Sequence, residues 1–335
     1  MKYIKLVVAV CLSIILHTTY PHFVTYELNP GRLGDHLLTY SKALLVQYLA
    51  EKEGRNIPLY HRPFKWSDQL TLSTVEQYIP PKRYETVPVI YYDKNTIAFT
   101  SSSPKTKQKP TGYVCSLKTI IYDIRGFTDL YRYTQKTPEF KKRLLEMISP
   151  VNPIESIDLP DNMPTVAIHV RTGGGFDKPL FMQSNLPSKP SGNHSFADLI
   201  YPLRFPPEIF YIEQLSEISR LYEFKPLFIH IFTDDPDPAA IVDRFKEKLK
   251  DFKLTFSYRT AANSHNTNVL EDLFNMTRFD CLIRPASSYS KIAQLLGNHT
   301  IIMYPNRSRW IDNKLIIEKV STINNRQQKN KRHRK

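Results

Sequence analysis

One segment near the middle of the chain combines a buried strand pattern with groups that can bind an anion. Thr165 to Val170 is a short apolar run rich in β-branched side chains, which predicts a strand buried on both faces of a parallel sheet. Arg171 and then Gly173 to Gly175 follow it. An arginine can donate two parallel hydrogen bonds to a phosphate, and glycines let backbone amides approach it. The segment predicts a phosphate site at a strand end; the alternative is a salt-bridged arginine before a flexible turn.

Two other predicted strands are also followed, shortly after their carboxyl ends, by polar side chains. Ligands of open α/β sheets bind beyond the carboxyl ends of the strands, so we expect these side chains to converge with Arg171. A cation for phosphate, carboxylates for hydroxyl groups and hydroxyls at a helix N-terminus are together suited to a nucleotide sugar. For each aspartate the alternative is a strand-end cap or a loop salt bridge. The groups are Asp234 and Asp235 after the strand Leu227 to Phe232, and Ser287 and Ser288 after the strand Asp280 to Ile283.

The C-terminal half of the chain alternates regularly between predicted strands and helices. Such an alternation predicts right-handed crossovers and a parallel, doubly wound sheet. The remaining strands are expected at Leu254 to Tyr258 and Thr300 to Tyr304, and the helices at Pro207 to Glu223, Ala239 to Phe252, Val269 to Arg278 and Tyr289 to Leu296.

The N-terminal half begins with a second candidate site. Phe23 to Leu28 predicts a strand, and apolar residues recur at helical spacing from Leu37 to Leu49. Gly31 and Gly34 between them suit a tight turn under a ligand, and Asp35 occupies the expected N-cap position of the helix. As a cap alone, Asp35 needs no further function.

Prolines between residues 149 and 164 mark the expected domain boundary, because proline sustains neither a helix interior nor a central strand. The predicted organisation is a leader at residues 1–20, an N-terminal acceptor-side α/β domain at 22–150, a C-terminal nucleotide-sugar-binding Rossmann-like domain at 165–320 and a basic disordered tail at 321–335.

The chain has 335 residues, of which 41% are hydrophobic, enough for two ordinary domains with cores of their own. The formal charge is +14, and six lysines and arginines in the last ten residues leave +8 for the rest. This tail is expected to be solvated and able to contact an anionic membrane. No aromatic residues interleave with it for base stacking, so no nucleic-acid partner is expected.

The first residues are typical of a targeting segment. Met1 to Lys5 is basic, and the apolar run Leu6 to Leu16 has the length of a signal-peptide core. We therefore expect a signal peptide or a membrane anchor and a location in the secretory pathway or at a membrane, the alternative being a first buried element of the domain. Four glycosylation sequons fit that expectation. Only Cys115 and Cys281 follow the leader, so no disulfide framework is expected.

Several common site types are absent from the sequence. No Gly-x-x-x-x-Gly-Lys-Ser/Thr segment occurs, which argues against a phosphate-loop nucleotidase. No cysteines and histidines have the spacing of a structural zinc site. No Gly-x-Ser-x-Gly turn indicates a serine hydrolase.

Four motifs resemble a known enzyme family in order along the chain, over about residues 24 to 305. His169-Val170-Arg171 with Asp177 resembles the His-x-Arg-Arg-x-Asp signature of the α1,2-, α1,6- and protein O-fucosyltransferases. The other three similarities are Gly31 to His36 with the N-terminal glycine turn of these enzymes, Thr233 to Pro236 with their second-strand motif, and Asp272 to Ser288 with their acidic helix, strand and Ser-Ser turn.

The resemblance implies an α/β fold of the GT-B-like kind, with two Rossmann-type doubly wound domains facing a cleft. It also implies GDP-fucose as donor, a glycan or protein acceptor, inversion at the anomeric carbon, no cofactor and no metal. By motif position, Arg171 would neutralise the leaving diphosphate, a role that some fixed cation must fill without a metal. The implied donor contacts are guanine for His169 and Asp272, phosphate for Ser287 and Ser288, the base or ribose side for Asp234 and Asp235, and close backbone approach for Gly34.

The chain departs from the family pattern at two residues. Thr172 replaces the second arginine of the signature, and three glycines are inserted before Asp177. Asp35 stands where relatives usually carry asparagine, and a carboxylate there could deprotonate the acceptor hydroxyl as a catalytic base. Thr172 favours the alternative function, a non-catalytic module of the same fold that binds a nucleotide sugar or glycan.

Overall fold

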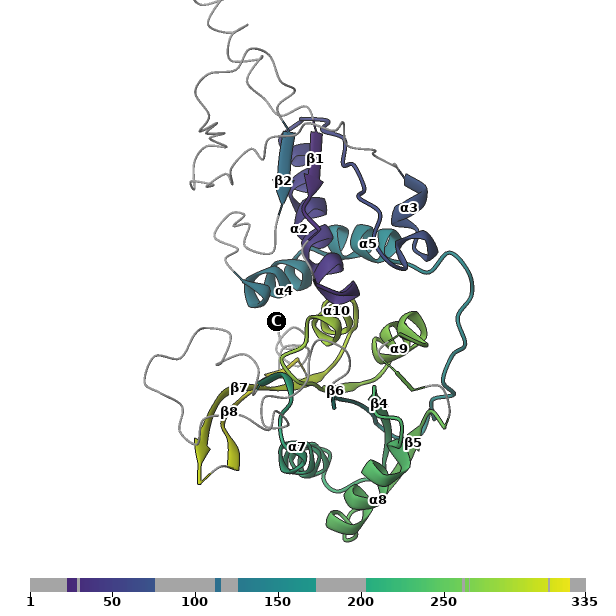
Figure 1. The fold of residues 1–335 in the computed structure, drawn as a ribbon, viewed down its shortest axis with the longest axis vertical. Coiled ribbons are helices and arrows are strands. Elements are labelled where there is room, and N and C mark those ends of the chain that lie inside the picture. Colours follow the sequence, from purple (N-terminus) through teal and green to yellow (C-terminus); the bar gives the residue numbers. More distant parts are fainter. Residues whose placement is uncertain are drawn as a thin grey trace, which may run out of the picture. The chain divides into compact units, whose positions relative to one another are not determined.

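The structure is a computed structural model that describes residues 23–28, 31–75, 112–115, 126–172, 203–260, 263–264, 266–312 and 314–325 (Figure 1). The chain divides into two compact units, residues 1–153 and 154–335. The predicted leader at 1–20 and the glycines 173–175 lie outside the described residues, and the predicted limits of the two α/β domains stay predictions. In the part of the chain that is described, no helix is both long enough and apolar enough for a membrane crossing.

The N-terminal unit contains a short parallel strand pair and several helices. β1 pairs with β2 in register from Phe23 opposite Gly112. Helix α5 (Pro138–Met147) begins with a proline at its first position, where the missing amide costs no helical hydrogen bond. A doubly wound sheet in this half stays a prediction. The elements are β1 (Phe23–Tyr26), α2 (Leu33–Lys52), the 3₁₀ helix η1 (Ser67–Gln69), α3 (Leu72–Val75), β2 (Gly112–Cys115), α4 (Phe127–Lys136) and α5 (Pro138–Met147).

Helix α2 begins earlier than the sequence predicts. Its first residue is Leu33, and the extended Arg32 occupies the cap position with φ −102° and ψ −175°. The Asp35 amide already donates to the Arg32 carbonyl at 2.9 Å, so Asp35 lies inside the first turn. The prediction of Asp35 as N-cap is therefore wrong. Its negative charge still suits the position, because unpaired amides make a helix N-terminus electropositive.

The C-terminal unit is built on one six-stranded sheet in the order β5-β4-β3-β6-β7-β8. The pairings between neighbours from β5 to β7 are parallel, which confirms the parallel-rich sheet predicted for this half, whereas β8 is antiparallel to β7. The strands are β3 (Thr165–Val170), β4 (Leu227–Thr233), β5 (Leu254–Tyr258), β6 (Cys281–Ile283), β7 (Ile301–Ile311) and β8 (Lys314–Asn324), and the helices are α7 (Glu208–Leu221), α8 (Pro238–Lys248), α9 (Val269–Met276) and α10 (Ser288–Leu296).

The hairpin of β7 and β8 differs from the sequence prediction. A strand was expected to end at Tyr304, but β7 continues to Ile311 and β8 returns to Asn324. Residues 321–324 therefore belong to a strand, and the prediction of a disordered tail that begins at residue 321 is wrong. The outer part of the hairpin is partly exposed, so its sequence mixes charged and apolar residues and lacks a buried-strand pattern.

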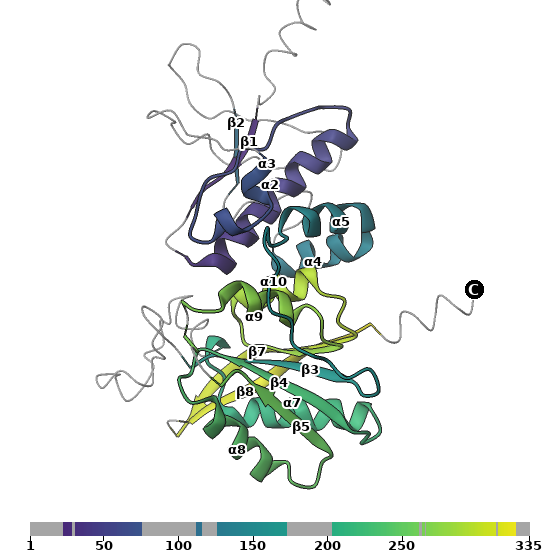
Figure 2. The same cartoon turned by 90° about the vertical axis from the view of Figure 1, so that its right-hand side faces the viewer.

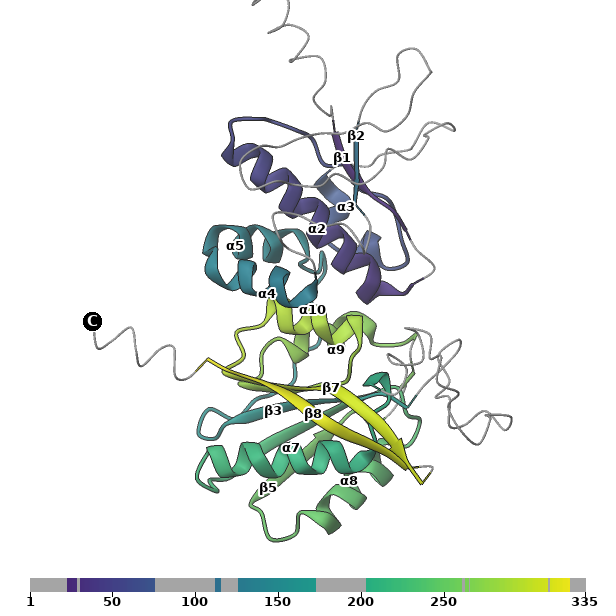
Figure 3. The same cartoon turned by 90° about the vertical axis from the view of Figure 1, so that its left-hand side faces the viewer.

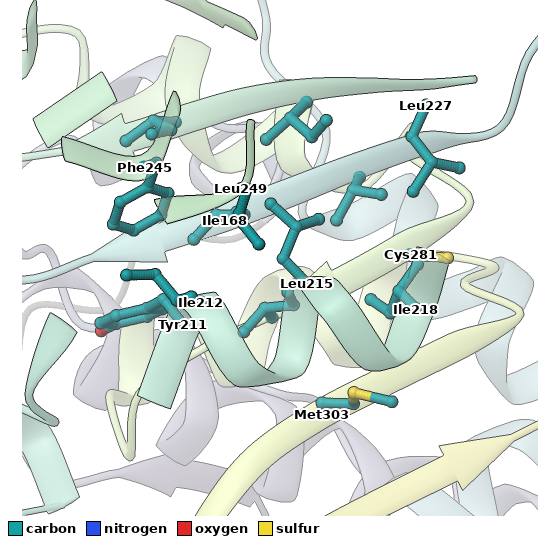
Figure 4. Close-up of a cluster of buried hydrophobic side chains, with 14 of the residues drawn as sticks. Ile168, Tyr211, Ile212, Leu215, Ile218, Leu227, Phe245, Leu249, Cys281 and Met303 are labelled. Carbon is teal, nitrogen blue, oxygen red and sulfur yellow. The ribbon is translucent and has the colours of Figure 1, made fainter. Parts of the chain in front are cut away.

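Helices cover both faces of the sheet, with α7 and α8 on one side and α9 and α10 on the other (Figures 2 and 3). The face toward α7 and α8, here called the aliphatic face, is a continuous apolar core (Figure 4). Ile168 of β3 lies in this core with Leu215 of α7 and Phe245 of α8, and all three side chains are fully buried. The opposite side, here called the polar face, carries His169, His230 and Phe232 from β3 and β4.

The segment that enters the C-terminal unit is held by side chains of the polar face. The Asn275 amide donates to the Glu155 carbonyl at 2.8 Å, and its oxygen accepts the Ile157 amide at 2.9 Å. Asp280 accepts both the amide and the hydroxyl of Thr165 at 2.9 and 3.0 Å, which fixes the start of β3. Asn275 belongs to one of the four sequons but is 1% exposed, so it is unsuitable for glycosylation in the folded chain.

Candidate functional site

The strand order of the C-terminal unit creates a topological switch point beside β3. From β3 the chain continues to β4 and β5 on one side of the sheet, and later to β6 and β7 on the other. Ile168 of β3 pairs with Ile283 of β6, so the residues that follow the two strands extend beyond the same edge. In open α/β sheets, crevices for ligands form at such carboxyl ends. The candidate site is built around this edge.

Arg171 extends beyond β3 at this edge and is partly exposed. Its guanidinium carbon lies 5.1 Å from the centre of the buried Phe205 ring, a cation–π distance. Leu203 lies two residues before Phe205. Its carbonyl accepts the amide of Ala286, in the turn between β6 and α10, at 2.8 Å. The segment 203–205 therefore lies against both strand ends and brings Arg171 into the neighbourhood of the Ser287–Ser288 turn.

The turn after β6 forms the start of α10. Ser287 is the residue before the helix, is 4% exposed, and its carbonyl accepts the Lys291 amide at 3.0 Å. Ser288 is the first helical residue and is partly exposed. A helix N-terminus presents unpaired amides, which suit an anion when a cation such as Arg171 lies near. The phosphate role of the two serines stays a prediction.

Arg284, which the sequence analysis missed, supports this turn from inside. Its side chain is 1% exposed. The Nε donates to the Gln294 side chain of α10 at 2.7 Å, and Nη1 donates to the Pro285 carbonyl at 2.9 Å. Its guanidinium carbon lies 4.3 Å from the centre of the Tyr304 ring. An arginine next to a proline directly after a short strand was the signal available in the sequence.

Asp234 and Asp235 make the contacts of strand-end caps. Asp234 Oδ1 accepts the amide of Thr172 at 2.9 Å and its hydroxyl at 3.2 Å. Asp235 Oδ1 accepts the Asp237 amide at 2.9 Å, in the turn that leads into α8. Both aspartates therefore act as strand-end caps, which was the structural alternative to a ligand-binding role. Each carboxylate keeps further lone pairs, and donor contacts of the two residues stay predictions.

Asp272 forms an ion pair with Arg259, a residue the sequence analysis also missed. Arg259 Nη2 donates to Asp272 Oδ1 at 3.1 Å, and the two side chains are 25% and 20% exposed. Burial raises the pKa of Asp272 to about 6, and the charge of Arg259 opposes that rise. Arg259 directly follows β5 as Arg171 follows β3, and this shared position could have identified it.

His169 lies under the helices of the polar face. Its ring is 8% exposed, and its centre lies 5.6 Å from the centre of the Tyr289 ring on α10. The Tyr289 hydroxyl donates to the Val269 carbonyl of α9 at 2.6 Å, and burial raises the pKa of Tyr289 well above its ordinary value. Tyr289 therefore stays neutral and links α10 to the start of the helix that carries Asp272.

His230 is a second buried histidine on this face. Its Nδ1 atom forms a hydrogen bond of 2.8 Å with the hydroxyl of Ser257 on β5. Burial lowers the pKa of His230 to about 4, and the charge of Arg259 adds to the decrease. His230 is therefore neutral at physiological pH, and Arg259 supplies a positive charge beside Asp272.

Gly34 and Asp35 lie in the N-terminal unit. Gly34 is buried in the first turn of α2, and Asp35 beside it is partly exposed. The Asp35 carbonyl accepts the Thr39 hydroxyl at 2.9 Å within the helix. A close approach of Gly34 to the donor and catalysis by Asp35 stay predictions. Among the described residues, no three His, Cys, Asp or Glu side chains are grouped as metal ligands.

Comparison with known proteins finds similarity in solved structures. No protein-family model matches the chain, and no curated protein sequence matches it. A mutant of Arabidopsis thaliana FUT1 in complex with GDP is similar with a TM-score of 0.50 and 13% identity, over 86% of this chain and 71% of that one.

Two further structures are similar at lower TM-scores. NodZ, a fucosyltransferase from Bradyrhizobium, has a TM-score of 0.39 and 14% identity, over 92% of this chain and 100% of that one. POFUT1 in complex with GDP has a TM-score of 0.31 and 16% identity, over 57% of this chain. The matched part is about half of the POFUT1 chain, 53%. The likeness to FUT1 shows that this chain shares its mixed α/β fold with a GDP-bound plant protein.

Proposed function

We propose that the chain is a metal-independent, inverting glycosyltransferase that transfers fucose from GDP-fucose to a hydroxyl group of a glycan or protein. The observation that carries the proposal is the convergence of three features at one carboxyl edge of a parallel sheet. These features are Arg171, the Ser287–Ser288 turn at the start of α10, and the Asp272–Arg259 pair. The GDP held by the similarly folded FUT1 structure supports the choice of donor.

The diphosphate would lie at the switch point. Arg171 supplies a fixed positive charge at the end of β3, and the first amides of α10 supply donors at the end of β6. The Ser287 and Ser288 hydroxyls add donors for phosphate oxygens. A contribution of the glycines 173–175, which lie outside the described residues, stays a prediction.

The base would lie on the polar face next to Asp272. An ionised carboxylate accepts two hydrogen bonds from the N1–H and 2-amino groups of guanine, a pattern that adenine and uracil do not offer. His169 and Tyr289 would form the wall beside the base. Asp234 and Asp235 would face the ribose side with the lone pairs left over from their capping bonds.

In the transfer step, the acceptor hydroxyl oxygen attacks the anomeric carbon of fucose from the side opposite GDP. The new carbon–oxygen bond forms as the bond to the β-phosphate oxygen breaks, and the bonding electrons leave with GDP. Arg171 stabilises the charge that develops on the diphosphate, a role that a preorganised cation fulfils without reorganisation. The carboxylate of Asp35 accepts the acceptor proton as general base.

Binding without transfer is the second candidate function. The hydroxyl and amide of Thr172, at the position of the second signature arginine, are both bonded to Asp234. Thr172 therefore brings no charge to the diphosphate. A module of this kind would bind the nucleotide sugar and release no GDP from it.

A thermal-shift screen tests the donor class. GDP, UDP and ADP and their common sugars are added to the wild type, to Arg171→Ala and to a control, Arg244→Ala. Arg244 pairs with Glu208 on the surface of the aliphatic side. We expect a stabilisation selective for GDP compounds that Arg171→Ala loses and the control keeps. A response to all three bases alike, or to none, would contradict the proposal.

A turnover assay separates the enzyme from the binding module. Release of GDP from GDP-fucose, with water or a supplied acceptor, is followed for the wild type and Asp35→Asn. We expect the variant to lose turnover while GDP still stabilises it. Full turnover in Asp35→Asn with an unchanged pH profile would rule out the base assignment, and GDP binding with no release by the wild type would favour the module.

A further inference from the structure

Arg259 occupies the same row of the sheet as the other polar-face groups near the carboxyl edge. Ile231 of β4 pairs with Tyr258, the last residue of β5, so Arg259 comes one step later beside Phe232. Phe232 in turn pairs with His169 of β3. The Arg259 carbonyl accepts the Asn263 side-chain amide at 2.8 Å, which holds the backbone after the strand. Arg259 is thus placed by the sheet itself.

The guanidinium of Arg259 is only partly used within the described chain. Nη2 donates to Asp272 Oδ1 at 3.1 Å. The Nε atom is buried and makes no hydrogen bond within the described residues. A guanidinium carries five N–H donors in a rigid fork, and leaving one buried and unsatisfied costs stability. Donors remain for a ligand that binds beside Asp272.

The pair presents a cation donor directly beside a carboxylate acceptor in a partly buried place. The Watson–Crick edge of guanine carries the complementary series: the O6 acceptor, then the N1–H and 2-amino donors. Asp272 Oδ1 has two lone pairs, so it can keep the bond from Arg259 and also accept N1–H. Adenine offers an amino group at the position of O6, which would meet Arg259 donor to donor.

We propose that Arg259 is a specificity-determining residue that donates a hydrogen bond to guanine O6 while Asp272 accepts from N1–H and the 2-amino group. This inference rests on the proposed function, in which the donor is a guanine nucleotide. It assigns O6 to the guanidinium and the other two groups to the carboxylate. A site that read guanine through Asp272 alone would not distinguish O6 from a weaker acceptor.

The alternative role for Arg259 is structural, namely to neutralise Asp272. Other charged or titratable groups near the pair are Glu271 on α9, Tyr289 on α10 and His230 on β4, and Tyr289 contacts His169 of β3. A structural role predicts that loss of Arg259 weakens the binding of every guanine analogue by the same factor. Recognition of O6 predicts a change in the ratio between analogues.

The test compares three nucleotides by calorimetric titration of the full chain at pH 7.5. GDP offers all three groups, 6-thio-GDP replaces O6 by sulfur, a weak acceptor, and IDP lacks only the 2-amino group. The wild type is expected to bind GDP about tenfold more tightly than either analogue, the effect of one charge-assisted hydrogen bond. Arg259→Gln is expected to bind GDP and 6-thio-GDP about equally while keeping its preference for GDP over IDP.

Two further variants make the result specific. Arg278→Gln removes an exposed arginine after α9 that donates to the Ile157 carbonyl, and it should keep all wild-type ratios. Asp272→Asn should lose the preference for GDP over IDP. Arg259→Met serves as a second variant if Arg259→Gln does not fold, with the same expected loss of the ratio between GDP and 6-thio-GDP.

The outcomes separate this inference from the proposed function. If the thermal-shift screen shows that the wild type binds GDP no better than ADP or UDP, the guanine site fails, and the role of Arg259 with it. If the wild type prefers GDP but the Arg259 variant keeps the full ratio between GDP and 6-thio-GDP, only the role of Arg259 is overturned. Equal weakening of all three nucleotides would also overturn it, in favour of the structural role.

Discussion

The two faces of the C-terminal sheet are made by alternate residues of the same strands and differ in kind. Ile168 of β3 packs into the aliphatic core, whereas His169, the next residue, contacts Tyr289 on the polar face. Burying hydrocarbon is favourable in any arrangement, but a buried polar group is costly without a partner. The aliphatic face therefore contributes stability, and the polar face maintains specific bonds such as the Arg259–Asp272 pair. We expect ligand chemistry on the face where such groups are kept.

The largest effect should come from the aliphatic face. Phe245 of α8 is fully buried in this core, so Phe245→Ala removes a whole ring and leaves a cavity. We expect the free energy of unfolding, from urea titration, to fall by about 3–5 kcal/mol. The GDP preference of the folded variant, measured by calorimetry, should be unchanged. A variant that lost the GDP preference while remaining folded would show that the two faces are not separate in function.

Packing on the polar side can be tested at the end of α10. A Cβ at Gly297 would lie against His299 Nε2 closer than van der Waals contact allows, and 2.9 Å from the Ala293 carbonyl. The His299 ring is fixed by a bond of 2.8 Å between Nδ1 and the Phe279 carbonyl. Gly297→Ala should lower the free energy of unfolding by about 1–3 kcal/mol. A variant as stable as the wild type would mean that the polar face packs loosely.

The polar face should also make stability depend on pH. The pKa of His230 is lowered from 6.5 to about 4 in the folded chain, so the unfolded chain binds the proton first. The contribution of His230 to the free energy of unfolding is therefore complete above pH 6.5. It falls as the pH decreases toward 4, by about 1–2 kcal/mol between pH 7 and pH 5. Asp272 has the opposite effect on stability. Its pKa is raised from 3.8 to about 6, so the folded chain binds the proton first and is stabilised as the pH decreases.

His61 in the N-terminal unit has a pKa lowered to about 4 by burial and adds to the acid loss, so the contribution of His230 needs its own variant. His230→Asn should lose less stability than the wild type between pH 7 and pH 5, measured by urea unfolding at both values. Equal losses in the two proteins would show that His230 does not contribute.

The smallest effect should appear at the strand-end cap. Asp234→Asn keeps an oxygen that can accept the Thr172 amide, whereas Asp234→Ala leaves that amide without its acceptor. We expect Asp234→Ala to lower the free energy of unfolding by about 1 kcal/mol and Asp234→Asn by less. If both variants are as stable as the wild type but bind GDP more weakly than it does, Asp234 serves the ligand and not the strand end.

The sequence predicts much of the C-terminal sheet because its central strands are buried on both faces. Apolar residues predominate in Leu227 to Phe232 and Thr165 to Val170, and β4 and β3 lie within one residue of those limits. Arg171 and the Ser287–Ser288 turn are found for the same reason, since a strand pattern that ends abruptly identifies the residues after it.

The sequence does not predict the parts that depend on pairing between distant segments. The outer half of the β7–β8 hairpin is partly exposed and carries no buried pattern. Arg259 follows a strand whose residues are only partly buried, so it does not stand out until Asp272 is brought beside it. Arg284 is comparable, because only the fold places Gln294 and Tyr304 around its guanidinium. Asp35 shows that a cap predicted from local sequence can lie three residues from the true cap, which is Arg32.

Hydrogen–deuterium exchange of the full chain with and without GDP tests most directly whether the polar edge is the binding site. The account predicts slower exchange in peptides that cover the end of β3 and Thr172, the first turn of α9, and the Ser287–Ser288 turn. Peptides of α7 and α8 should exchange at unchanged rates. GDP binding that protects α7 and α8 but leaves those three segments unchanged would contradict the account.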